Sequence, residues 1–306
     1  MTENIITINN ISKSYKDILA LNKLNLEVKK GEMFGLIGPD GAGKTTLTRI
    51  LATLLLPDSG ICYIDNFNVV KEFRKVRKII GYMPERFSLY PDLTVKENLR
   101  FFADLFNVKT KVKEKRLKEL LKFNRLEPFQ NRKTQELSGG MKQKLALSCT
   151  LIHTPRLLIL DEPTTGVDPL SRREFWAILN TLKNMGVSIF ITTPYLSEAE
   201  NCDRIGLLHN GQILTIDTPD KIPLLFSHEL IEIKGENLFE VSRKLKNIDS
   251  IIDIQIFGDK LHLTVEKAEK VIPLINGIFK KLNIKISEVN QVNPGIEDTF
   301  IELIKS

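Results

Sequence analysis

Apolar residues recur along the chain at two spacings, and the spacing changes from segment to segment. The first β-rich segments cover residues 6–15 and 24–39, and they lead into a glycine-rich turn and an amphipathic stretch at 43–56. This order predicts a strand, a loop and a helix in succession at the start of an α/β domain.

The middle of the chain has a helical spacing and is heavily charged. Residues 89–136 follow a strand-like segment at 79–84 and predict a helical subdomain, with bounds of about 88–150. From Leu157 the α/β alternation returns: buried strands are expected at 157–163 and 187–193, and helices at 171–186 and 195–203. We therefore expect an α/β core that carries a helical insertion.

The composition shifts near residues 218–226, which predicts a domain boundary. The tail that follows alternates as strand, helix, strand, strand, helix and strand, and then ends in a short helix. This order is typical of a small ferredoxin-like α+β domain. The sequence thus predicts an α/β domain with an antiparallel β subdomain over 1–222 and an accessory domain over 223–306.

The overall composition narrows the class of protein. The chain has 306 residues, 42% of them hydrophobic, and no apolar run approaches the roughly 18 residues of a membrane-spanning helix. Its three cysteines lie far apart, which indicates neither a disulfide framework nor a zinc site. The net charge of +6 could favour phosphates, nucleic acid or an anionic membrane, but it is modest for a chain with 44 basic and 38 acidic residues, and a solvated surface is the favoured interpretation. We expect a soluble protein of the reducing cytoplasm that meets a membrane only through a partner.

The glycine-rich turn fits the phosphate-loop pattern GxxxxGK[ST]. Such a loop needs backbone N–H groups at a helix N-terminus that can approach phosphate without a Cβ in the way. A lysine then neutralises phosphate oxygens, and the following hydroxyl reaches Mg²⁺. The candidate ATP-binding residues are Gly38, Pro39, Asp40, Gly41, Ala42, Gly43, Lys44, Thr45 and Thr46.

Two further motifs support this interpretation. The segment LLILDEP places Asp161 at the end of an apolar strand, where it can hold Mg²⁺, and next to it Glu162 is the candidate base for the attacking water. Between the two motifs, LSGGMKQ opens a predicted helix that runs to about His153. Its Ser138, Gly139 and Gly140 supply a hydroxyl and unhindered N–H groups, which make a second anion site.

These three motifs, in this order, resemble the ATP-binding cassette (ABC) family, over roughly residues 4–220. Met141 stands where the family signature LSGGQ usually has glutamine. The resemblance implies that two cassettes pair head-to-tail, so that the signature of one closes on the ATP held by the other. It also implies that Tyr15 stacks on adenine and that Asp168 lies in the loop that crosses the dimer interface.

Two segments resemble the ATPases of ABC-2-type exporters, the drug-resistance and efflux group. They are RFSLYPDLTVKENLRFFADLF after the first strands and PGIEDTFIELI at 294–304. The resemblance implies a separately encoded permease as partner and a position at the inner face of the cell membrane. The basic stretch at 109–122 is read as a solvated face.

Three positions depart from the family, and all surround the same nucleotide. Glu85 replaces the glutamine that senses Mg²⁺ and water, Asp40 replaces an asparagine in the phosphate loop, and Pro194 replaces the histidine that contacts the γ-phosphate. Proline has neither a side-chain donor nor an N–H. The neighbouring Thr193 hydroxyl is a possible substitute. The hypothesis is a slow ATP site in this chain and an efficient site completed with a different, histidine-bearing ATPase.

Two other functions remain open at this point. One is a regulatory subunit that binds ATP without hydrolysing it, which Pro194 favours. The other is a soluble ABC ATPase acting on ribosomes or nucleic acid. Such proteins usually carry two cassettes in one chain or a long coiled-coil insertion, and this sequence has neither.

Overall fold

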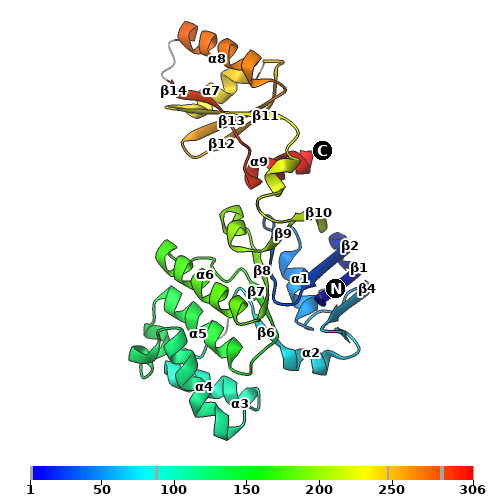
Figure 1. The fold of residues 1–306 in the computed structure, drawn as a ribbon, viewed down its shortest axis with the longest axis vertical. Coiled ribbons are helices and arrows are strands. Elements are labelled where there is room, and N and C mark those ends of the chain that lie inside the picture. Colours follow the sequence, from blue (N-terminus) through cyan, green and yellow to red (C-terminus); the bar gives the residue numbers. More distant parts are fainter. Residues whose placement is uncertain (1–2, 87–88, 247, 283–285, 306) are drawn as a thin grey trace. The chain divides into compact units, whose positions relative to one another are not determined.

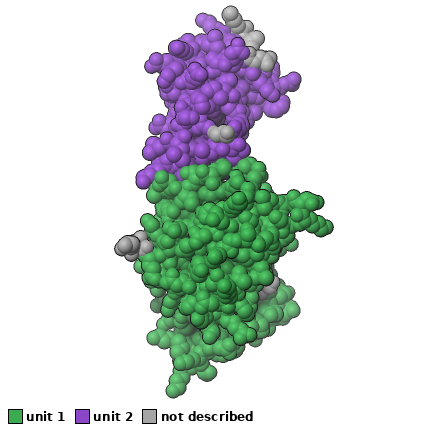
Figure 2. All heavy atoms as spheres, turned by 90° about the vertical axis from the view of Figure 1, so that its right-hand side faces the viewer, with its two compact units in different colours: residues 1–219 green, residues 220–306 purple. Residues whose placement is uncertain are grey.

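The structure is a computed structural model that describes residues 3–86, 89–246, 248–282 and 286–305. Contacts divide the chain into two compact units, Met1–Pro219 and Asp220–Ser306 (Figure 2). The boundary expected from the sequence, after residue 222, lies just inside the second unit. Within the described ranges, no helix combines the length and the apolar character needed to cross a lipid bilayer.

A six-stranded sheet runs through the first unit (Figure 1). Its order is β10-β9-β3-β8-β7-β6, with all neighbours from β9 to β6 parallel and β10 antiparallel to β9. Every residue of β3, β7 and β8 is buried, as expected for parallel strands covered on both faces. The strands are β3 (Met33–Ile37), β6 (Ile80–Met83), β7 (Leu157–Asp161), β8 (Ser188–Thr193), β9 (Arg204–His209) and β10 (Gln212–Asp217).

A second, antiparallel sheet has the order β2-β1-β4-β5. The strand-like segment at 24–39 is divided between the two sheets, because Gly31 takes a left-handed φ of 72° at the turn between β2 and β3. The strands of this sheet are β1 (Asn4–Tyr15), β2 (Ile18–Lys29), β4 (Ser59–Ile64) and β5 (Phe67–Asn68).

The helical subdomain gathers beside the central sheet and has a hydrophobic core of its own (Figure 1). Its first helix begins with a capping box in which Thr94 and Glu97 bond each other's backbone N–H groups. Leu99, Leu117 and Leu145, from three different helices, are fully or almost fully buried in that core. The helices are α3 (Val95–Leu105), α4 (Thr110–Phe123), the short 3-10 helices η1 (Glu127–Phe129) and η2 (Thr134–Glu136), and α5 (Gly139–Leu151).

The remaining helices of the first unit differ from the sequence prediction at two places. The helix expected over 43–56 ends at Leu51, and the helix expected over 195–203 is a short 3-10 helix in which the side chain of Glu198 is buried. The helices are α1 (Lys44–Leu51), α2 (Phe73–Ile79), α6 (Pro169–Asn184) and η3 (Leu196–Asn201).

The second unit has the ferredoxin-like order of elements. Its four-stranded sheet has the order β12-β13-β11-β14 and is antiparallel throughout. Leu261, Leu263 and Val265 of β13 point to the face that packs against α7 and α8. The elements are η4 (Ile222–Leu225), β11 (Glu229–Gly235), α7 (Leu238–Leu245), β12 (Ile251–Phe257), β13 (Lys260–Val265), α8 (Ala268–Leu282), β14 (Ile286–Val292) and α9 (Ile296–Lys305).

The other face of this sheet carries a polar cluster around His262. Its Nδ1 lies 2.7 Å from Asp298 Oδ1 of α9, and its Nε2 lies 3.4 Å from Glu232 Oε2 of β11. Glu232 also pairs with Lys260 and Lys234, which hold the pKa of that carboxyl at about 2. Burial by itself lowers the pKa of His262, but the two carboxylates outweigh it and raise the pKa.

Candidate functional site

The phosphate loop connects the buried strand β3 to α1, at the centre of the six-stranded sheet. A Cβ on Gly38 would lie 2.2 Å from the backbone oxygen of Leu208, and a Cβ on Gly43 would lie 2.4 Å from that of Ala20. Gly43 also has a φ of 109°, which side chains rarely tolerate. The two glycines of the motif are therefore required by packing as well as by access to a ligand.

Lys44 is buried at the first turn of α1, with 3% of its surface exposed. Its ammonium donates to the carbonyl oxygens of Gly38, at 2.7 Å, and Pro39, at 3.0 Å. The same nitrogen lies 3.1 Å from Glu162 Oε1. A buried cation is thus held by the loop and faces the carboxylate that the sequence identified as the candidate base.

The end of β7 places a second carboxylate beside α1. Asp161 Oδ1 accepts a hydrogen bond from Thr192 Oγ1 at 2.8 Å and lies 3.4 Å from Thr45 Oγ1. Asp161 Oδ2 is buried and has no hydrogen-bond partner among the described residues. An orphaned carboxylate oxygen next to a threonine hydroxyl fits the hard oxygen ligands that Mg²⁺ prefers.

A cavity of about 500 Å³ opens over the phosphate loop. It brings together residues from β1, the loop, α1 and the ends of β6, β7 and β8. The predicted site residues that line it are Tyr15, Asp40, Gly41, Gly43, Lys44, Thr45, Thr46, Glu85 and Glu162, and Pro194 lines it as well.

Other residues of this cavity were not found from the sequence. Thr165 and Tyr195 line it, and the Thr165 hydroxyl lies 3.4 Å from Glu162 Oε2. Thr192, which lies outside the lining, contacts both the candidate base and the candidate Mg²⁺ ligand: its oxygen atoms accept from the backbone N–H of Glu162, and its hydroxyl donates to Asp161. In the sequence, the one feature that could have pointed to Thr192 is its place near the end of a buried strand. Its contacts with Asp161 and Glu162 arise because β7 pairs with β8.

The hydroxyl of Thr193 is engaged away from the loop. It donates to Glu198 Oε2 at 2.6 Å and accepts from the backbone N–H of Tyr195 at 3.1 Å. Glu198 also accepts from Thr164 at 2.8 Å, and both carboxylate oxygens are therefore occupied. Thr193 is 1% exposed. In this arrangement the Thr193 hydroxyl has no free proton with which to replace the histidine donor that is missing at position 194.

The signature residues and Asp168 lie at two helix N-termini outside this cavity. Ser138 caps α5 by accepting from the backbone N–H of Met141, and Asp168 caps α6 by accepting from that of Ser171 at 2.9 Å. That backbone hydrogen bond lowers the pKa of Asp168. Gly139 has open space beside it, whereas a Cβ on Gly140 would lie 2.3 Å from Ser171 Oγ. The two helix starts are therefore packed against each other.

Comparison with known proteins agrees with these motifs. The family model for ABC transporters matches residues 21–165. The chain is 37% identical over 308 residues to the probable multidrug ABC transporter ATP-binding protein YbhF of Escherichia coli K12, covering 99% of this chain and 53% of that protein. It is 36% identical over 300 residues to the Nod factor export ATP-binding protein I of Rhizobium etli, covering 97% and 92%. The chain belongs to the ABC family of transporter ATP-binding proteins.

Solved structures give the same assignment over most of the chain. A dimeric ATP-binding cassette in a post-hydrolysis state, bound to ADP and phosphate, has a TM-score of 0.64 and is 30% identical, covering 70% of this chain and 98% of that one. Cassettes of this family bind ATP, and its hydrolysis drives transport. The chain spans about half the length of YbhF, 53% by alignment.

Within this cassette, the three departures from the family pattern gather around one cavity. Asp40, Glu85 and Glu162 place three carboxylates in its lining, against the single ammonium of Lys44. A triphosphate adds further negative charge, so its binding here depends on a cation to offset the repulsion. Pro194 lies in the same lining and offers no donor.

Proposed function

We propose that this chain is the ATP-hydrolysing subunit of an export transporter. The observation that carries the proposal is that Lys44, Thr45 and Glu162 line one cavity. Asp161 Oδ1 lies 3.4 Å from the Thr45 hydroxyl. Lys44 and the loop amides bind the phosphates, Tyr15 stacks on adenine, and Glu162 accepts the proton of the attacking water.

Mg²⁺ is the cation proposed for the site. Thr45 and Asp161 are the ligands best supported, because of the orphaned Asp161 oxygen, and Glu85 is an additional candidate that lines the same cavity. When bound, Mg²⁺ would offset the charge of the phosphates and stabilise the charge that develops during hydrolysis.

The contact between Lys44 and Glu162 gives the cavity a simple response to ATP. The Lys44 ammonium cannot pair fully with the Glu162 carboxylate and with the phosphates at the same time. Phosphates near the loop compete for Lys44, and the Glu162 carboxylate is then released from its ion pair of 3.1 Å. A free carboxylate is the better proton acceptor, so binding of ATP prepares the base.

A second cassette is proposed to complete the site. Ser138, Gly139, Gly140 and Asp168 lie outside the cavity that holds the loop, which supports a role toward the nucleotide of a partner. The partner is a second copy of this chain or a different ATPase. Because neither Pro194 nor the engaged Thr193 hydroxyl supplies a donor at the position of the family's histidine, a partner with a histidine at that position is favoured.

The membrane component is proposed to be a separate permease of the ABC-2 type. The printed names of the relatives refer to multidrug transport and to Nod factor export, and the linearmycin resistance protein LnrL of Bacillus subtilis is 31% identical, covering 96% of this chain and 96% of that protein. The proposed location is the cytoplasmic face of the cell membrane, held there by the permease.

The deciding experiment measures ATP binding and phosphate release separately. We expect the chain to bind Mg·ATP and to release phosphate slowly, and we expect Glu162→Gln to retain binding while it abolishes release. The control is Lys118→Gln, which removes a charge at an exposed position of α4, outside the cavity lining and the signature. A chain that fails to bind Mg·ATP would refute the proposal.

The second candidate function is a regulatory subunit that binds ATP without hydrolysing it. The observation in its favour is the engaged Thr193 hydroxyl beside Pro194. It becomes the better account if phosphate release by the chain, alone and with a partner ATPase, is no faster than release by Glu162→Gln.

A further inference from the structure

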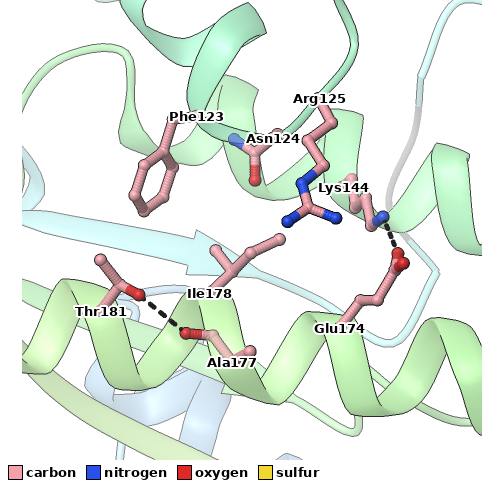
Figure 3. Close-up of a pocket in the computed structure, with 8 residues that line it drawn as sticks. All are labelled: Phe123, Asn124, Arg125, Lys144, Glu174, Ala177, Ile178 and Thr181. Atoms are coloured by element: carbon pink, nitrogen blue, oxygen red, sulfur yellow. Dashed lines mark hydrogen bonds and ion pairs between the residues drawn. The ribbon is translucent and has the colours of Figure 1, made fainter.

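A second cavity lies between α4, α5 and α6, and it shares no lining residue with the cavity over the phosphate loop. Its volume is about 190 Å³. The end of α4 forms one wall and the middle of α6 forms the opposite one (Figure 3). The lining residues are Phe123, Asn124, Arg125, Lys144, Glu174, Ala177, Ile178 and Thr181.

Asn124 carries a buried acceptor without a partner. Its side chain is 1% exposed, and its Nδ2 donates to Ser148 Oγ at 2.7 Å and to Leu120 O at 3.3 Å. Leu120 O can only accept, and the Ser148 hydroxyl already donates to Lys144 O at 2.8 Å. The amide NH₂ must therefore point to that side, which fixes the orientation of the group.

The remaining atom, Asn124 Oδ1, has no hydrogen-bond partner among the described residues. Figure 3 shows this oxygen and the Arg125 guanidinium directed from the end of α4 toward Ile178 of α6. A buried acceptor that no protein donor satisfies costs free energy. A ligand that donates a hydrogen bond at this place removes that cost.

Arg125 supplies the one uncompensated charge of the lining. It takes a left-handed φ of 56° immediately after α4, which turns its exposed side chain over the cavity. Lys144 and Glu174, which also line the cavity, neutralise each other in a close ion pair. No ion pair of Arg125 occurs within the ranges that the structure describes. The cavity therefore favours an anionic group.

The surroundings strengthen that preference. Helix α4 carries six basic and two acidic side chains over Thr110–Phe123, so an acidic partner is attracted and a basic one is repelled. The floor is apolar where Phe123, Ala177 and Ile178 meet. The site thus combines the unpaired acceptor Asn124 Oδ1, the cationic guanidinium of Arg125 and a short apolar surface.

The size of the cavity decides between kinds of ligand. Pockets for whole drug-sized ligands have volumes of about 300–1,000 Å³, and this cavity is smaller. It admits a single side chain with part of its backbone. An inorganic anion can pair with Arg125 but does not offer the apolar stem that the floor accommodates or an N–H for Asn124.

We propose that this cavity binds an acidic residue in a peptide segment of a partner protein. A peptide N–H donates to Asn124 Oδ1, the carboxylate pairs with the guanidinium of Arg125, and the side-chain methylenes cover Ile178. Two of the three helices that form the cavity, α5 and α6, begin at the signature residues and at Asp168. A partner seated here contacts both helices that support the proposed dimer interface.

The test titrates short blocked peptides into the isotopically labelled full chain and follows the backbone amide NMR signals around Arg125. The probe is acetyl-AAEAA-amide, and the matched peptide has glutamine at the centre. With few contacts, a dissociation constant of about 1 mM is expected. The glutamate peptide should bind about tenfold more tightly than the glutamine peptide, as one charge-assisted hydrogen bond supplies.

Three variants locate the site. Arg125→Gln should weaken binding of the glutamate peptide about tenfold, and Ala177→Phe, at an exposed position on α6, should block the cavity. Lys122→Gln removes the same charge from the last turn of α4 without touching the lining, and it should leave binding within about twofold. ATP binding should be unchanged in all three, which separates this proposal from the function of the nucleotide site.

Several results would overturn the proposal. One is the absence of binding at a peptide concentration about ten times the expected dissociation constant. Another is equal binding of both peptides, or a glutamate peptide that binds normally to Ala177→Phe. If N-acetylglutamate alone binds as tightly as the peptide, the cavity is a site for a small carboxylate and a partner segment is ruled out.

Discussion

Replacing Pro194 by histidine tests the chemistry of the nucleotide site most directly. Pro194 lines the cavity that also contains Lys44 and Glu162, so a side chain at this position faces the same space. The hydroxyl of the preceding residue, Thr193, donates to Glu198 at 2.6 Å, and Thr193 is almost fully buried. A histidine would therefore add a side-chain donor at a position where neither the proline nor the adjacent Thr193 hydroxyl supplies one.

The size of the effect follows from the number of donors restored. Loss of one preorganised donor to a developing charge reduces the rate about 100- to 1,000-fold in well-characterised sites. Removing the proline ring gives the unfolded chain more conformational freedom, which lowers the free energy of unfolding by about 0.4–1 kcal/mol. That change affects stability rather than turnover. An imidazole placed by substitution is less well oriented than an evolved one, so we expect an increase of about tenfold or more in phosphate release.

The assay is steady-state phosphate release at saturating Mg·ATP, with Pro194→Ala as the matched control. Alanine removes the proline ring but adds no side-chain donor, so its rate should stay near that of the original chain. Tyr195→Phe tests the other polar group that lines this side of the cavity. If Pro194→His is no faster than Pro194→Ala while the unaltered chain already turns over briskly, the reasoning is wrong. In that case another donor, such as the Tyr195 hydroxyl, has replaced the histidine.

Three further predictions concern the rest of the fold. Gly43→Ala should abolish ATP binding and lower the free energy of unfolding by about 1–3 kcal/mol, because its Cβ meets Ala20 O at 2.4 Å; calorimetry and nucleotide titration measure both. The contacts of His262 with Asp298 and Glu232 raise its pKa, so their stabilisation is present below the unfolded pKa of about 6.5 and is lost as the pH rises through the raised folded value. The thermal unfolding midpoint of the second unit, measured by calorimetry, should therefore fall as the pH rises over that range. A midpoint that rises with pH, or the same pH dependence in His262→Gln, would contradict this account. All three cysteines are buried and burial raises their pKa, so a thiol reagent should react with them only on unfolding; rapid reaction of the native chain would be inconsistent with this packing.

The local sequence determined the elements that depend on neighbouring residues alone. The buried strands at β7 and β8, the glycines of the phosphate loop and the helix start at Ser138 follow from short motifs and apolar runs. These features need no distant partner, because hydrogen bonds within a few residues and burial on both faces already select them. The ferredoxin-like order of the second unit could be predicted for the same reason.

Only the tertiary structure decided which side chains are free to act. The sequence offered the Thr193 hydroxyl as a replacement for a missing histidine, but this hydroxyl donates its hydrogen bond to Glu198, a buried glutamate five residues later. Likewise the orphaned oxygens of Asp161 and Asn124 become visible only when every neighbouring donor is placed. Hydrogen-bond partners come from strands and helices far apart in the chain. A motif can therefore fix the position of a reactive group, but packing decides whether that group already has a partner.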